Sequence, residues 1–149
     1  MSTGTSLYDK DSHAWTIEQA ALLRGGKWHA LDVANLIEEI ESLGTSQRKE
    51  VRSRLRRLVM HLLKWRYQPT RRTPSWRRTI RTQRLEIDDA RSDSPSLRPQ
   101  VPALLQRAYP GACTLAADET GLPLATFPEA CPWTVEQVLD EDFWPEETR

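Results

Sequence analysis

Apolar residues in the middle of the chain recur three and four positions apart, the spacing of one face of an α-helix. We predict a helix that starts at Thr45 or Ser46 and reaches about Trp65, and its apolar face is the expected core. Gln68 and Pro69 end it, because the residue before a proline avoids the α region. The apolar face consists of Val51, Leu55, Leu58, Val59, Leu62 and Leu63.

Two helices are predicted before this one. The first lies within residues 11–24 and is stopped by a pair of glycines. The second runs from Asp32, a good N-cap, to Leu43, and Gly44 is expected to close it. Its apolar positions follow the i, i+3, i+4, i+7 rule and are Val33, Leu36, Ile37, Ile40 and Leu43.

Further helical segments are predicted in the second half of the chain. One helix runs from Ser75 to about Arg91, and its surface is predicted to be dominated by Arg77, Arg78, Arg81 and Arg84. Residues 99–120 have a helical tendency, but Pro110 is expected to kink or break them, because proline removes a helix hydrogen bond. Thr134 and Gln137 have the spacing of a capping box and predict a short last helix.

The expected fold class is all-α, because no segment shows the period-two alternation of a strand. A chain of 149 residues can bury a real core, so we expect one helical domain over residues 1–149. Its expected architecture is a compact bundle of four main helices plus C-terminal helical segments. No apolar run approaches the ~20 residues of a membrane span, and the N-terminus does not resemble a secretory signal. With only two cysteines, a cytoplasmic location is expected.

The distribution of charge is more informative about function than the overall composition, because charge is segregated along the chain. Residues 1–46 carry a net charge of −4, residues 47–91 of +11 and residues 92–149 of −7, although the total is zero. This layout predicts a basic interaction surface in the middle of the chain. Its candidate residues are Arg71, Arg72, Arg77, Arg78 and Arg81.

Two interpretations of the basic segment stay open. With Trp65, Tyr67 and Trp76 interleaved, it could bind phosphates and stack nucleic-acid bases. Alternatively, the acidic ends of the chain could lie against arginines such as Arg77 and Arg78 and neutralise them. The pI of about 6.8 favours neutralisation, because nucleic-acid-binding domains usually have a high pI.

A carboxylate–histidine metal site is a further hypothesis. Glu38 and Glu41 share a helix face, His61 lies on the next predicted helix, and facing helices can build metal sites in this way. The alternative is a core histidine, because His61 is followed by two leucines. No nucleophile, phosphate-loop or zinc motif occurs, so no catalytic residue and no cofactor are predicted.

Several strings of residues resemble a bacterial family catalogued as domain of unknown function 29. They cover about residues 8–145 in the expected order. The resemblance implies a compact helical bundle and carries over no activity, cofactor or catalytic residue. The chain departs from the family pattern at Pro102 and Pro110, where the pattern is an uninterrupted acidic helix. The strings are YDKDSHAWTIEQAALLRGG (8–26), LIEEIESLG (36–44), HLLKWRYQP (61–69), SWRRTIRTQRLEI (75–87), DSPSLRP (93–99), ETGLP (119–123) and FPEACPWTVEQVLDEDFWP (127–145).

The sequence therefore favours a non-enzymatic helical module that binds a protein partner, with self-association included. The first alternative is a nucleic-acid-binding protein that uses the basic helices of residues 46–91. The second is a metal-dependent enzyme with its site at Glu38, Glu41 and His61.

Overall fold

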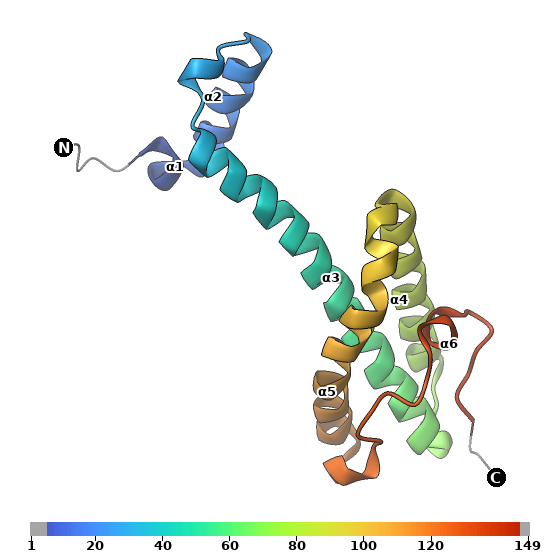
Figure 1. The fold of residues 1–149 in the computed structure, drawn as a ribbon. Coiled ribbons are helices and arrows are strands. Elements are labelled where there is room, and N and C mark those ends of the chain that lie inside the picture. The colour runs from blue at the N-terminus through green and yellow to red at the C-terminus, as the bar shows by residue number, and fades with distance from the viewer. Residues whose placement is uncertain (1–5, 147–149) are drawn as a thin grey trace. The chain divides into compact units, whose positions relative to one another are not determined.

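The computed structural model describes residues 6–146, which form helices and turns and contain no strand (Figure 1). The all-α prediction is confirmed. The chain divides into two compact units, one that ends at residue 45 and one that begins at residue 46, and we describe each by itself. We call the described parts the N-terminal unit (6–45) and the C-terminal unit (46–146). No helix among the described residues is long and apolar enough to cross a membrane.

The N-terminal unit contains α1 (Leu7–Lys10), α2 (Ser12–Arg24), the 3-10 turn η1 (Trp28–Ala30) and the start of α3 (Val33–Tyr67). The predicted helix within residues 11–24 is confirmed as α2, whereas the short α1 was not predicted. Among the described residues of this unit, Trp15 is the one buried hydrophobic side chain. Its Nε1 donates to Asp32 Oδ2 at 3.0 Å and thereby ties α2 to the start of α3.

Helix α3 is continuous through Gly44, so the prediction of two helices separated at this glycine is wrong. A glycine that closes a helix usually adopts a left-handed conformation. Gly26 and Gly121 have positive φ angles in the structure, and Gly44 does not. An interior glycine costs a helix only about 1 kcal/mol, which the long flanking segments of α3 outweigh.

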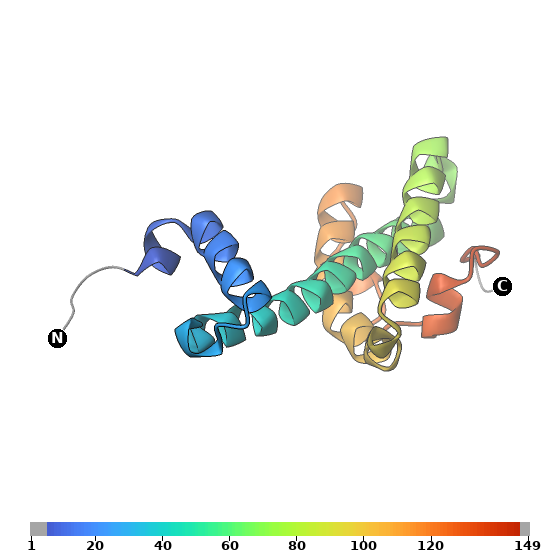
Figure 2. The ribbon, with the colours of Figure 1, turned by 90° about the horizontal axis from the view of Figure 1, so that it is seen from above.

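The C-terminal unit packs the second half of α3 against α4 (Pro74–Asp93), α5 (Val101–Thr120) and α6 (Val135–Leu139) (Figures 1 and 2). The predicted stripe is confirmed, because its leucines Leu55, Leu58 and Leu62 have no exposed surface. They share one apolar cluster with side chains of α4 and α5, such as Ile80 and Val101.

Helix α5 continues through Pro110, so the expected break does not occur. Proline removes one helix hydrogen bond, but buried neighbours on both sides, Tyr109 and Ala112 among them, hold this part of α5 in the core. Helix α5 ends at Gly121, whose φ of 73° is left-handed. The capping box predicted from Thr134 and Gln137 is present at the start of α6.

Candidate arginine cleft

Four of the five predicted surface arginines line one cleft of about 630 Å³ in the C-terminal unit. These four are Arg72, Arg77, Arg78 and Arg81, and Trp65, Thr73, Pro74 and Thr82 complete the lining. The fifth, Arg71, ends the preceding 3-10 turn η2 (Pro69–Arg71) and does not line the cleft. We call this feature the arginine cleft.

The start of α4 builds one wall of the arginine cleft. Thr73 caps the helix, because its Oγ1 accepts a hydrogen bond from Trp76 N at 3.2 Å, and Pro74 occupies the first turn. Arg77, Arg78 and Thr73 thus lie within the first two turns, where the helix dipole adds a partial positive charge. The local sequence therefore concentrates positive potential at this wall.

The indole of Trp65 is covered rather than open to a ligand. Only 6% of Trp65 is exposed, and the ring of Trp144 lies 4.7 Å from its ring centroid. The guanidinium groups of Arg72 and Arg77 lie 4.8 and 5.6 Å from the same centroid. Stacking on an aromatic ring fixes the plane of a guanidinium and leaves the N–H edge of Arg77 able to donate, whereas Arg72 Nε already donates to Trp65 O at 2.8 Å.

Arg77, Arg78 and Arg81 form no ion pair within residues 6–146. Of the acidic residues in the C-terminal segment, Glu141 and Asp142 line a smaller hollow together with Arg81. Neutralisation by direct ion pairing is therefore absent at these three arginines in the described part of the chain.

A neighbouring hollow of about 690 Å³ shows the opposite behaviour. It is lined by both signs of charge, and some of these charges are paired with one another. Lys64 forms an ion pair with Glu119, and Arg54 Nη2 lies 3.0 Å from Glu50 Oε1. Glu50 and Glu119 in its lining offset part of its positive charge, so it is a weaker candidate for binding an acidic ligand than the arginine cleft, whose lining contains no acidic residue.

Arg84 is the residue that sequence reasoning placed wrongly. It was grouped with the surface arginines, but only 2% of it is exposed. Its Nε donates to Val138 O and its Nη2 to Phe143 O, both at 2.8 Å, and burial lowers the pKa of its guanidinium. The sequence held a signal for this, because residue 84 lies on the same helix face as Ile80 and Ile87.

The metal-ligand candidates occupy different surroundings. Glu38 and Glu41 are exposed in the N-terminal unit, whereas His61 is 8% exposed in the C-terminal unit. His61 Nδ1 lies 3.0 Å from the carbonyl oxygen of Arg57, and burial lowers the pKa of the imidazole. This is the environment of a satisfied core histidine. No group of three or more His, Cys, Asp and Glu side chains in residues 6–146 could hold a metal ion.

Comparison with known families gives one match. The family model of domain of unknown function DUF29 matches residues 7–144, nearly the whole chain. The chain belongs to this family. No curated protein and no solved structure matches it. The DUF29 match includes α4 and every residue of the arginine cleft, so the cleft belongs to the family domain itself.

Proposed function

We propose that this DUF29 protein is a non-enzymatic interaction module that binds a carboxylate-rich segment of a protein partner in the arginine cleft. The observation that carries the proposal is the convergence on one cleft of four arginines, none of which forms an ion pair within residues 6–146. A cytoplasmic location is part of the proposal, and the free thiols of Cys113 and Cys131 support it.

Carboxylates suit the arginine cleft because of how guanidinium groups donate. Each guanidinium offers parallel N–H donors that match the two oxygens of a carboxylate, and charge-assisted bonds of this kind are among the stronger polar contacts. Arg78 and Arg81 are exposed and one helical turn apart on α4, so they can engage successive acidic residues.

Nucleic acid suits the same cleft less well. Recognition of single strands usually combines phosphate contacts with bases stacked on aromatic rings, and the ring of Trp65 is already covered by Trp144 and two arginines. Glu141 and Asp142 line the smaller hollow beside Arg81 and would repel a polyanion long enough to extend past that arginine. A short acidic segment avoids both difficulties.

Binding of labelled probes to the full chain at low salt tests this proposal. Fluorescence anisotropy should show that a glutamate-rich peptide binds, and that a single-stranded oligonucleotide of equal charge binds more weakly. Replacing Arg78→Gln and Arg81→Gln together should weaken peptide binding by about tenfold or more, as loss of two charge-assisted contacts does.

The matched control is the pair Arg98→Gln and Arg107→Gln, two exposed arginines of the same unit that lie outside the arginine cleft. This pair should change affinity less than twofold. Equal losses in the two double variants, or no peptide binding at all, would exclude the cleft as the site. Tighter binding of the oligonucleotide would favour the nucleic-acid alternative instead.

A further inference from the structure

The N-terminal unit holds most of the large hydrophobic residues that the described chain exposes. Of the eleven such residues in 6–146, eight lie in this unit. Four of the eight recur three and four positions apart on one face of α3, and we call them the α3 stripe. The stripe consists of Val33, Ile37, Ile40 and Leu43, which are between 51% and 68% exposed.

The N-terminal unit is short of a core of its own. Trp15 is the one buried hydrophobic residue among residues 6–45, whereas Ile37 and Ile40 remain open to water. A segment of about 40 residues rarely folds stably without help from disulfides, metals or association with another chain. A contiguous exposed apolar surface on a small protein also marks an interaction site. Both observations call for a partner surface over the α3 stripe.

Acidic side chains flank the α3 stripe. Successive residues of a helix project about 100° apart, so Glu39 and Glu41 extend to either side of Ile40. Glu38 lies one turn before Glu41 on the same side. All three glutamates are exposed, and none of them forms an ion pair in the described part of the chain. Residues 1–46 carry seven acidic and three basic side chains, so the unit around the stripe has a negative net charge.

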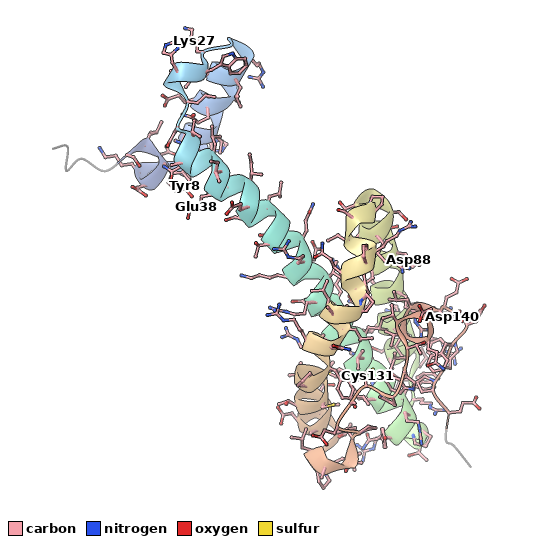
Figure 3. All side chains as sticks on the ribbon, in the orientation of Figure 1. Tyr8, Lys27, Glu38, Asp88, Cys131 and Asp140 are labelled. Atoms are coloured by element: carbon pink, nitrogen blue, oxygen red, sulfur yellow. The ribbon has the colours of Figure 1, made fainter. Side chains whose placement is uncertain are left out.

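A hydrogen bond between α1 and this part of α3 does not remove the negative charge. Tyr8 donates its hydroxyl to Glu39, and this bond to a carboxylate raises the pKa of Tyr8 to about 12. The tyrosine is therefore a neutral donor at pH 7, and a neutral donor does not cancel the charge of a carboxylate. Figure 3 shows Tyr8 close to Glu38, whereas Lys27 lies at the turn before α3, away from both.

The flanking charges argue against a second copy of this chain as the partner. Two stripes that cover each other about a two-fold axis would bring Glu38 and Glu41 of one copy against the same glutamates of the other. Like charges at close range repel each other. A partner with basic side chains meets no such repulsion, because those side chains would face the glutamates along the edge of the apolar contact.

We propose that the α3 stripe binds a basic amphipathic helix of a partner protein. Spacings of four and three residues are those of the seam between two packed helices, so apolar side chains at the same spacing on the partner would cover the stripe. Lysines or arginines beside that seam would face Glu38 and Glu41. From Val33 to Leu43 the stripe is about 15 Å long, which a partner helix of about three turns matches. The site is independent of the arginine cleft, whose residues lie in the C-terminal unit.

Fluorescence anisotropy of a labelled leucine–lysine peptide, titrated with the full chain at low salt, is the first test. A peptide whose leucines form one helix face should bind, and a scrambled peptide of the same composition should bind at least tenfold more weakly. Ile40→Lys should weaken binding of the first peptide at least tenfold by placing a charge in the stripe. The control Leu85→Lys alters a comparably exposed residue of the C-terminal unit, 60% against 68%, and should change affinity less than twofold. Equal binding of both peptides, or equal binding by both variants, would overturn the proposal.

A charge reversal tests the role of the glutamates. Glu38→Lys with Glu41→Lys should weaken binding of the amphipathic peptide about tenfold, because two attractive charge pairs become repulsive. The control, Asp89→Lys with Asp118→Lys, changes the net charge equally at exposed positions of the C-terminal unit and should change affinity less than threefold. Equal losses in the two double variants would reduce the binding to general charge attraction and overturn the proposal.

Sedimentation of the full chain without peptide completes the test. The chain should show no self-association that depends on the α3 stripe. Dimers that Ile40→Lys disrupts and Leu85→Lys does not would assign the stripe to a second copy and would also overturn the proposal. Circular dichroism should show the same helix content in every variant, because all the substituted side chains are exposed.

Discussion

The two units use one helix pattern in different ways. In the C-terminal unit, the apolar face of α3 at Val51, Leu55 and Leu58 is at most 1% exposed, because α4 and α5 supply apolar side chains to cover it. In the N-terminal unit, Ile37 and Ile40 follow the same spacing and are 51% and 68% exposed. Helical periodicity therefore identifies the apolar face of a helix but does not say whether the same chain covers it.

Truncation of one side chain in each unit gives the largest expected contrast. Leu58→Ala should lower the free energy of unfolding by about 2–5 kcal/mol, because a fully buried leucine leaves a cavity. Ile40→Ala should change it by no more than about 0.5 kcal/mol in dilute protein, because the side chain is already exposed. Urea unfolding followed by circular dichroism measures both. Similar losses in the two variants would mean that the units do not differ in burial as described.

The next largest effect on stability is expected at Arg84, the buried arginine of the C-terminal unit. Arg84→Met should destabilise the unit by about 2 kcal/mol, because the carbonyls of Val138 and Phe143 lose charge-assisted hydrogen bonds. Hydrogen exchange should rise selectively in residues 134–146. The control Arg98→Met removes an exposed arginine and should leave both measurements unchanged. Unchanged exchange in Arg84→Met would show that this side chain does not hold the C-terminal segment.

Mild acid should also lower the stability of the C-terminal unit. Burial lowers the pKa of His61, so below its usual value of about 6.5 the unfolded chain binds a proton that the folded chain resists. The stability that depends on a neutral His61 is fully present above pH 6.5 and is lost as the pH falls toward the folded pKa. Urea midpoints between pH 7.5 and 5 should therefore decline, and His61→Gln should flatten that decline. An equal slope in both proteins would assign the pH dependence to other groups.

The smallest contrast concerns two glycines inside helices. A methyl group at Gly44 would meet no atom within 4 Å, so Gly44→Ala should stabilise the chain by about 0.5–1 kcal/mol. At Gly111 the new carbon would lie 3.0 Å from Cδ of Arg56, so that side chain has to shift and the gain should be smaller. Thermal unfolding of the two variants compares them directly. A larger gain at Gly111 would contradict this order.

Local signals in the sequence predicted most of the helices. The cap at Thr134 and the stop at Pro69 depend on neighbouring residues alone, and the structure has both. The predicted helix end at Gly44 and the predicted break at Pro110 were wrong. A single unfavourable residue inside a long helix is outweighed by the flanking segments and, at Pro110, by core packing. The prediction of one domain over residues 1–149 stays a prediction.

The arginine cleft could be predicted in part. The charge distribution identified its four arginines, and their closeness follows from the sequence, because three lie on α4 and Arg72 lies two residues before it. The cover over Trp65 could not be foreseen, because Trp144 lies 79 positions away in the chain and only tertiary structure brings the rings to 4.7 Å. The burial of Arg84 could have been predicted, because its spacing from Ile80 and Ile87 places it on the inner face of α4.

Arg84 has a consequence for how the C-terminal segment can change in evolution. Its guanidinium binds main-chain carbonyls at Val138 and Phe143, and a carbonyl is the same whichever side chain its residue carries. These two contacts therefore tolerate substitutions at both positions. They do not tolerate a change in length, because one inserted or deleted residue between 138 and 143 moves a carbonyl away from its donor. Among natural variants of this segment, we therefore expect the number of residues between 138 and 143 to be conserved.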